Sequence, residues 1–325
     1  MTGQQAHNYG NPPPTGNAFM GTMFGVPPPP DNPVPMRDYR AHALGQPFNL
    51  RARFKVPKPL LGPVLGMPSA AVARLMAGVG YDFICLDWEH TPFGVAELVE
   101  LIKWIHYASE GTCATIVRVP GFDKHYISWA LDAGASAIIV PHCETVEQVE
   151  GIVKNCRFPL DHGHRSFPPF AVLPGINDGA PEGKSAVNVW NDHAAIIVQI
   201  ESRKAVENVD ALAAVPGVDG LMIGSGDLRM DLGLGGGMDG PEEIYNDCIT
   251  TVLKAAKKHG DMPVLHFAFG PDAIKKRLGQ GFRILGTQSD VTVLATGLRQ
   301  DLTMGRKACA EFEAERSENE NGNGH

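Results

Sequence analysis

The sequence predicts an α/β protein, a (β/α)8 TIM barrel with a disordered Pro-rich amino-terminal extension and a polar carboxyl-terminal tail. Three observations carry this prediction. The 325 residues are 43% apolar, enough for one large core. Eight short apolar runs alternate with eight helix-like segments. The apolar runs are continuous, as expected of strands that are buried on both faces. Eight strand–helix units in succession are typical of a closed parallel barrel.

The two ends of the chain differ in composition from the region between them. Residues 1–36 are rich in Gly, Pro and Asn, with proline runs at 12–14 and 27–30. Such a segment buries too little apolar surface to offset its ordering entropy, so we expect a disordered extension. A ligand for a small adaptor domain is the alternative. The polar tail 313–325 is also expected to be disordered, which leaves 37–312 for the barrel.

The barrel elements follow in order along the chain. Ser69 is a plausible N-cap of the first helix, and Gly78 or Gly80 lies near its end. The predicted strands are 60–66, 83–87, 115–119, 137–140, 196–201, 220–224, 264–268 and 283–286. The predicted helices are 70–80, 95–109, 126–134, 146–156, 205–215, 241–258, 272–279 and 291–310. A long Pro/Gly-rich insertion, 158–192, precedes the fifth strand, and loops of that length are usually functional lids or oligomer contacts.

Charge and cysteine usage exclude several classes of protein. The net charge is −8 and the isoelectric point is about 5.8, so no basic field indicates nucleic acid or an anionic membrane. No apolar run reaches the roughly 18 residues of a membrane span, and no secretory signal is recognisable. The six cysteines form no C-x-x-C pair, which fits reduced thiols and a cytoplasmic location.

Two carboxylates follow neighbouring strands. Glu201 ends the fifth predicted strand, and Asp227 follows the sixth after Gly224-Ser225-Gly226. Parallel barrels place successive strand ends side by side on the rim that holds the active site. Two carboxylates there are suitable ligands for Mg2+ or Mn2+. An ion pair or a helix-cap role is the alternative for both.

Neighbouring residues extend this candidate metal site. The backbone N–H groups of Ser225 and Gly226 can turn toward a bound anion. Gln199 lies two residues before Glu201, so it shares that residue's face of the strand and is a candidate ligand contact.

The second strand ends in Asp87-Trp88-Glu89-His90, with three ionisable residues in four positions. The unperturbed pKa of His90 lies near 7, so it is a candidate general base that Asp87 or Glu89 would orient. Polar residues that merely solvate the barrel rim are the alternative.

Two more polar residues end the third and fourth strands. Arg118 stands in an apolar strand, where a buried charge needs an acceptor. Its planar fork can hold a substrate carboxylate or enolate oxygen, or it can pair with Glu89. His142 follows the fourth strand and is a candidate substrate contact on the same rim.

One absence narrows the chemistry. A Schiff-base aldolase needs a lysine inside the barrel, and none of the eight strand runs contains one. Carbanion stabilisation would then have to come from a metal ion.

With these residues the chain resembles the HpcH/HpaI aldolase/citrate lyase family from about Leu61 to Phe312. The motifs that carry the resemblance are Gly80-Tyr81-Asp82-Phe83, Asp87-Trp88-Glu89-His90, Leu131-Asp132-Ala133-Gly134-Ala135, Gln199-Ile200-Glu201-Ser202 and Val215-Pro216-Gly217-Val218-Asp219-Gly220-Leu221. Further motifs are similar to those of a condensing branch of the family: Pro141-His142, Arg165-Ser166-Phe167-Pro168-Pro169-Phe170, Pro174-Gly175 and Glu207-Asn208-Val209-Asp210.

The resemblance implies a divalent metal held by Glu201 and Asp227, with pyruvate enolate or oxaloacetate as the bound species. It implies Arg118 near the oxo acid, His90 as acid and base, and a homo-oligomer, a hexamer in the family, whose last helix packs on a neighbour. The condensing branch adds His142 near a second substrate.

Three positions depart from the family pattern. Thr91, which follows His90, stands where the family has glycine or another small residue. Ser225 stands where the family has proline, and we expect the turn to be kept but loosened. Val187 stands where the condensing branch has tyrosine.

The expected function is a divalent-metal-dependent carbon–carbon lyase that acts on a small 2-oxo acid by retro-aldol cleavage or decarboxylation. A CoA-thioester lyase, for which Arg165, Lys184 and Arg229 are the few basic candidates, is one alternative. A condensing enzyme and a non-catalytic barrel are the others.

Overall fold

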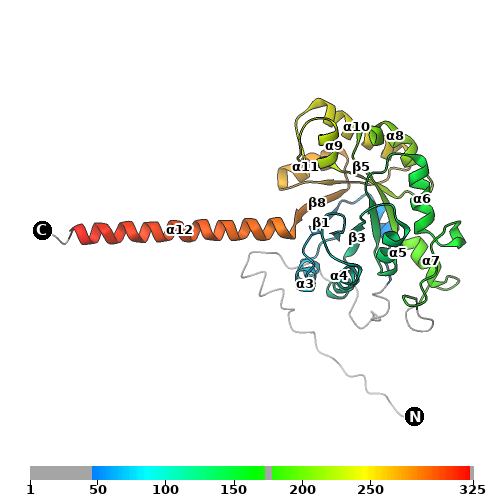
Figure 1. The fold of residues 1–325 in the computed structure, drawn as a ribbon, viewed down its shortest axis with the longest axis horizontal. Helices are drawn as coiled ribbons and strands as arrows, with labels where there is room; N and C mark the ends of the chain where they lie inside the picture. Colours follow the sequence, from blue (N-terminus) through cyan, green and yellow to red (C-terminus); the bar gives the residue numbers. More distant parts are fainter. Residues whose placement is uncertain (1–45, 173–177, 323–325) are drawn as a thin grey trace, which may run out of the picture.

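Eight parallel strands close into a barrel in a computed structural model that describes residues 46–172 and 178–322. The strands pair in chain order, β1 to β8, and β8 pairs with β1. Helices surround the strands, and one long helix leaves the barrel (Figure 1). The predicted fold class is therefore confirmed. The extension expected at residues 1–36 lies outside the described residues.

The strands and most helices begin and end within a few residues of the predicted positions. The strands are β1 Leu60–Leu65, β2 Phe83–Asp87, β3 Ala114–Arg118, β4 Ala137–Val140, β5 Ala195–Ile200, β6 Gly220–Ile223, β7 Val264–Phe267 and β8 Ile284–Ser289. The helices are α2 Leu50–Phe54, α3 Ala70–Gly78, α4 Val95–Ala108, α5 Lys124–Asp132, α6 Val146–Cys156, α7 Ala186–His193, α8 Arg203–Ala214, α9 Ser225–Asp231, α10 Glu243–Lys258, α11 Pro271–Gln280 and α12 Asp290–Gly322.

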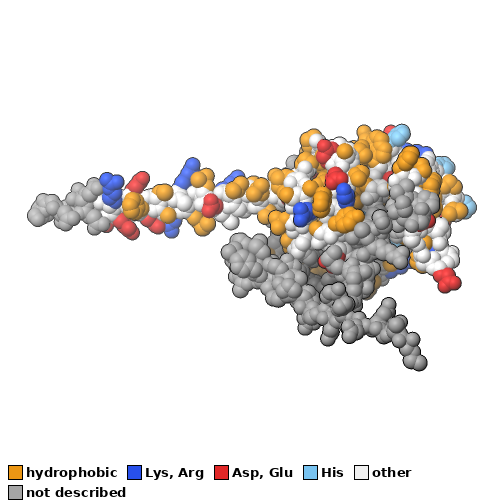
Figure 2. Space-filling model, turned by 90° about the horizontal axis from the view of Figure 1, so that it is seen from below, with side chains coloured by type: hydrophobic (Ala, Val, Ile, Leu, Met, Phe, Trp, Pro, Cys, Tyr) orange, Lys and Arg blue, Asp and Glu red, His pale blue; other side chains and the backbone are white. Residues whose placement is uncertain are grey.

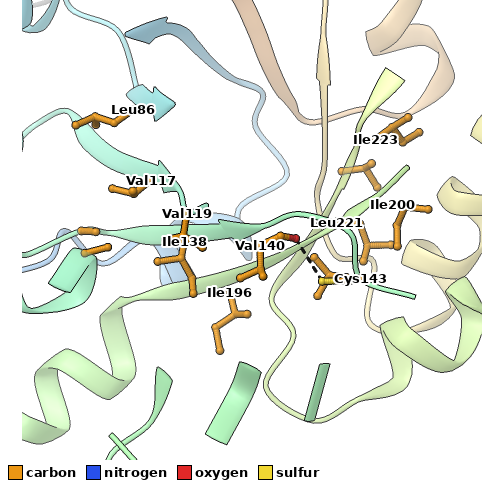
Figure 3. Close-up of a cluster of buried hydrophobic side chains, with 14 of the residues drawn as sticks. Leu86, Val117, Val119, Ile138, Val140, Cys143, Ile196, Ile200, Leu221 and Ile223 are labelled. Atoms are coloured by element: carbon orange, nitrogen blue, oxygen red, sulfur yellow. Dashed lines mark hydrogen bonds between the residues drawn. The ribbon is translucent and has the colours of Figure 1, made fainter. Parts of the chain in front are cut away.

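Both faces of the strands are buried, as their continuous apolar runs predict. One cluster, which includes Phe83, Ile116 and Met222, fills the inside of the barrel. A second cluster lies between the strands and the helices. Figure 3 shows part of this outer layer, where Val117 and Ile138 come from neighbouring strands. The two layers hold the strand ends in fixed positions, so polar residues that follow the strands are held rigidly.

A short helix closes the amino-terminal end of the barrel. Leu50 and Phe54 of α2 pack into the inner cluster. Next to them Asp219 accepts hydrogen bonds from Arg51 Nε at 2.8 Å and from Arg157 Nη2 at 3.1 Å. Five residues show too little periodicity to predict such a helix from sequence.

The last helix is longer than predicted. Helix α12 continues to Gly322, so the expectation of a disordered tail from residue 313 is wrong for 313–322. Good helix formers such as Glu and Ala in this stretch favour the continuation. Val291, Leu294 and Leu298 on this helix are more than half exposed. Figure 2 shows such apolar side chains along its projecting length.

The insertion before β5 has structure of its own. It contains a 3-10 turn at Pro159–Asp161 and helix α7, which ends two residues before β5. Its described part therefore enters at the amino-terminal end of the strands. Pro168 and Phe170 lie with Val99 of α4 and Trp129 of α5 around an outer groove. The described part is thus not a lid over the carboxyl ends of its own strands, and an oligomer contact stays a prediction.

Candidate active site

Glu201 directly follows β5 and is buried, with 3% of its surface exposed. Its Oε1 accepts a 2.6 Å hydrogen bond from the backbone N–H of His142. Its Oε2 accepts a short hydrogen bond from the Gln199 side-chain amide. The prediction that Gln199 shares the face of Glu201 is confirmed, and its role there is to hold this carboxylate.

Gly224 leaves the room that Glu201 occupies. A Cβ at this position would overlap Glu201 Oε2 and would lie 2.9 Å from Gln199 Nε2. The residue after β6 must therefore lack a side chain for Glu201 to lie between the ends of β5 and β6. The sequence indicated a glycine-rich turn here but not this close contact.

The backbone at His142 has an uncommon conformation. Its φ is +53°, in the left-handed region that residues other than glycine rarely adopt. This conformation turns the His142 N–H toward Glu201, while the imidazole Nδ1 lies 3.3 Å from the same Oε1. The side chain itself is 64% exposed on the rim. Left-handed residues outside glycine are often associated with functional sites.

Arg118 is paired mainly with Asp87. Arg118 Nε and Nη2 donate to the two carboxylate oxygens at 2.9 and 2.6 Å, and Glu89 Oε2 lies 3.3 Å from Nε. Burial lowers the pKa of Arg118, but the hydrogen bond and charge of Asp87 outweigh it, so the pKa is raised. Arg118 therefore stays charged. The predicted pairing with Glu89 is present but secondary, and Asp87 positions Arg118 rather than the ring of His90.

Glu89 lies between three basic groups. His90 Nε2 is 3.7 Å from Oε2 and His142 Nε2 is 3.8 Å from Oε1. Burial raises the pKa of Glu89, although Arg118 and the two histidines oppose this. The imidazole of His90 is 62% exposed, so it can reach a ligand on the rim. The structure thus brings together the residues that end β2, β3, β4 and β5.

Asp227 lies in a helix that the sequence analysis missed. Helix α9 begins at Ser225, and Asp227 is half-buried in its first turn. Glycines on both sides of Ser225 made this segment resemble a turn, because glycine is a poor helix former. The first N–H groups of a helix have no partner within it, which suits the predicted role of the Ser225 and Gly226 backbone. The Ser225 hydroxyl is buried and bonds His266, so it does not face the rim.

A small cavity lies inside the barrel below Arg118. Asp87, Arg118, Cys85 and Phe267 contribute to its lining, and it has room for about one water molecule. Burial raises the pKa of the Cys85 thiol to about 12, so this thiol is not a nucleophile at neutral pH.

Comparison with known proteins decides the family. Residues 65–296 match the HpcH/HpaI aldolase/citrate lyase family. The chain belongs to this family. It is 31% identical to a hydroxypyruvate/pyruvate aldolase of Paraburkholderia phytofirmans over 262 residues, which cover 78% of this chain and 95% of the relative. It is 35% identical to a 4-hydroxy-2-oxovalerate aldolase of Novosphingobium aromaticivorans, over 62% of this chain and 74% of the relative.

A solved structure gives the same answer for the fold. The crystal structure of macrophomate synthase matches with a TM-score of 0.76 and 38% identity, over 83% of this chain and 93% of that one. The further motifs named in the sequence were similar to those of this enzyme, and the similarity to it is confirmed. The predictions of family and of a carbon–carbon lyase of the aldolase type are thereby confirmed. In the described part of the chain, no helix is both long and apolar enough to cross a bilayer.

Proposed function

We propose that this protein cleaves a carbon–carbon bond of a small 2-oxo acid, by retro-aldol cleavage or decarboxylation, with Mg2+ or Mn2+ held by Glu201 and Asp227. The observation that carries the proposal is the environment of Glu201. This carboxylate is buried, and among the described residues no lysine or arginine contacts it. The His142 imidazole, 3.3 Å from Oε1, is charged only when it is protonated. A buried carboxylate without a permanent cationic partner is costly, and a bound cation removes that cost.

The donor set fits such an ion. Among the described residues no three His, Cys, Asp or Glu side chains converge on one point, so this part of the chain offers no closed cage of side-chain ligands. Mg2+ is commonly bound by one or two carboxylates, with water and substrate oxygens as its other ligands. When bound, the ion would supply an electron sink for the carbonyl group of the oxo acid.

Arg118 would hold the substrate oxygen on which negative charge develops. Two of its nitrogens are used by Asp87, and Nη1 has no hydrogen-bond partner among the described residues. The bidentate bond fixes the plane of the guanidinium, so Nη1 needs no reorientation when a substrate binds. Fixed donors of this kind stabilise developing charge because no reorganisation is required during the reaction.

His90 would move the proton. Its imidazole is exposed and its Nε2 lies near Glu89, so it can exchange a proton with the substrate and with solvent. Cleavage to a pyruvate enolate requires one proton to leave the hydroxyl of the substrate and one to return to the enolate carbon. Glu89 would orient the ring during both transfers.

Condensation is a second candidate, because the crystal structure of macrophomate synthase is 38% identical to this chain. His142 would then contact the second substrate, since its imidazole is exposed on the rim. At the position of the synthase's tyrosine, Val187 packs in the cluster of Phe158 and Trp190. That cluster lies before β5, at the end of the barrel opposite this chain's own site.

The CoA-thioester alternative finds less support. It requires free basic groups for the nucleotide phosphates, and the three candidates are already paired. Arg165 bonds Asp132, Lys184 bonds Asp192 and Arg229 bonds Glu242. Acetyl-CoA or malyl-CoA binding would separate this alternative from the first.

The chain is also proposed to be a homo-oligomer, as the resemblance implies, with a hexamer as the expected state. Val291, Leu294, Leu298 and Leu302 are exposed and lie on one side of α12, since they are spaced by three or four residues. A helix with such a stripe is stable when it packs on a partner. Native mass spectrometry of wild type and Leu298→Glu tests this. A monomeric wild type would contradict it, and a smaller assembly for the variant would support it.

A cytoplasmic location remains part of the proposal. All six cysteines are free, and four of them are buried. Free buried thiols fit a reducing compartment.

The proposed activity is tested by a screen of 2-oxo acids for pyruvate release. Protein stripped of metal with EDTA is assayed alone, with Mg2+ and with Mn2+, and in parallel as Glu201→Gln. We expect release only with added metal, and a loss of at least about 100-fold in the variant. Equal activity after EDTA treatment would contradict the metal-dependent mechanism.

A further inference from the structure

Three buried polar side chains meet behind helix α9. Ser225, Tyr245 and His266 come from α9, α10 and β7, and each is at most 1% exposed. His266 Nε2 lies 3.1 Å from the Ser225 hydroxyl and 3.1 Å from the Tyr245 hydroxyl. The Tyr245 and Ser225 hydroxyls also lie within hydrogen-bonding reach of each other, so their two protons are shared among three contacts. We call these three residues the α9 anchor.

The protonation of His266 follows from its surroundings. Its Nδ1 lies 2.6 Å from the backbone carbonyl of Phe267, which can only accept, so Nδ1 carries the proton. Burial, aided by the charge of Arg277, lowers the pKa of His266 to about 4, so the ring is neutral at pH 7. The lone pair of Nε2 therefore points at the two hydroxyls. The anchor is held together by neutral hydrogen bonds alone.

The anchor acts on the first residue of α9. Ser225 begins this helix, and Asp227 lies two residues further on in the same turn. Helix α9 is seven residues long, and its other buried residues are Leu228 and Arg229. The next turn is held by Arg229, which bonds Glu242 at 2.6 and 2.9 Å and lies over the Tyr245 ring. Tyr245 thus touches the residues that hold both turns.

The anchor also bears on the replacement of proline at position 225. A proline would fix the first turn of the helix through its ring. Ser225 lacks that constraint, but its buried hydroxyl is hydrogen-bonded to His266. The expected loosening of the turn is therefore opposed by a contact that the sequence motif does not reveal.

We propose that Tyr245 and His266 are positioning residues, which hold the Ser225 hydroxyl and so fix the orientation of Asp227, the proposed second metal ligand. This inference rests on the proposed function, because it assigns the anchor to the carboxylate pair that would hold the metal. Groups that orient metal ligands commonly change metal affinity by tenfold or more when removed.

The test is the Mn2+ affinity of metal-free protein, measured by titration calorimetry without substrate. Ser225→Ala, Tyr245→Phe and the double variant are compared with wild type, and folding is checked by circular dichroism. We expect each single variant to raise Kd by about tenfold. The double variant should be no weaker than the weaker single variant, because both changes break one path. Tyr245→Phe keeps the ring and tests the anchor even if Ser225→Ala folds poorly.

Thr115→Val is the matched control. Thr115 is another fully buried hydroxyl 3.1 Å from a buried imidazole, that of His106, near the start of β3. Its loss should lower thermal stability and leave the Mn2+ Kd unchanged. An anchor that only stabilises the fold would behave like this control.

The possible failures are distinguishable. If wild type binds Mn2+ and both anchor variants bind it equally well, the anchor is overturned and the proposed function stands. Additive losses in the double variant would also overturn a single shared path. If wild type binds no Mn2+, the proposed function fails and the anchor's role fails with it.

Discussion

The two ends of the barrel surround a carboxylate with opposite kinds of partner. At the amino-terminal end Asp219 is neutralised by Arg51 and Arg157 and also accepts the N–H of Ile196. At the carboxyl-terminal end Glu201 accepts a backbone N–H and a side-chain amide, both uncharged. The fold thus neutralises Asp219 with two arginines, whereas Glu201 has two neutral hydrogen-bond donors and the His142 imidazole 3.3 Å from Oε1. The difference supports the proposal that Asp219 serves stability and that Glu201 binds a cation.

The largest expected effect is the loss of stability when the charge of Asp219 is removed. Asp219→Asn leaves the buried Arg157 without its counter-charge, and loss of one partner of a buried ion pair commonly costs about 3–5 kcal/mol. Chemical denaturation should show this loss while Mn2+ affinity stays at the wild-type value. Glu201→Gln should do the reverse, with little loss of stability. Comparable stability losses for the two variants would remove the contrast.

The next effect concerns the charge that faces the substrate. Arg118→Lys keeps a positive charge but loses the fork that bonds Asp87 twice. We expect kcat/KM for pyruvate release to fall by about 10²–10³, as when a fixed donor to developing charge is lost. Arg203→Lys, a change of an exposed arginine at the start of α8, is the control and should keep wild-type kinetics. Equal kinetics for Arg118→Lys would exclude the role given to Arg118.

A third expected effect is a pH dependence of the free energy of unfolding, which His266 causes. The folded-state pKa of His266 is about 4 because of burial, below its ordinary value of 6.5. As pH falls from 6.5 toward 4, the unfolded chain binds a proton that the folded chain does not, so stability is lost on acidification. The loss at this site is on the order of 3 kcal/mol.

His266→Phe should lack that component. The difference in unfolding free energy between wild type and variant is measured from pH 7.5 to 4. A difference that does not change with pH would show that His266 is not held neutral.

The smallest effect concerns Gly224 and Gly226, the two glycines that flank Ser225 in the sequence. Gly224→Ala places a Cβ against Glu201, and we expect Mn2+ affinity to fall by about 10–100-fold. At Gly226 an added Cβ meets nothing within 4 Å. Gly226→Ala should therefore stabilise α9 by about 0.5–1 kcal/mol. Equal Mn2+ titrations of Gly224→Ala and wild type would contradict the close packing described for Glu201.

The sequence predicts the positions of the strands better than the contacts between side chains. Strand positions follow from apolar runs, and polar residues just after those runs, such as Glu201 and Arg118, are identified by chain position alone. The partner of Arg118 cannot be identified in this way, because Asp87 and Glu89 both lie at the end of the neighbouring strand. The left-handed turn at His142 cannot be predicted either, since it depends on Glu201 accepting its N–H.

His266 and helix α9 are two features that were not predicted from the sequence. His266 stands in an apolar strand, Val264–Phe267, where a buried imidazole requires partners. Its partners Ser225 and Tyr245 are distant in the chain, so only the fold identifies them. Helix α9 was hidden by glycine propensity, which tertiary contacts such as those of Arg229 override.

The central claim is that Glu201 and Asp227 together bind a divalent cation. Calorimetric titration of Mn2+ into metal-free wild type, Asp227→Asn and Asp219→Asn tests it most directly. We expect one site per chain in wild type and in Asp219→Asn, and a Kd at least about tenfold weaker in Asp227→Asn. Equal Mn2+ binding by wild type and Asp227→Asn, or none by wild type, would contradict it.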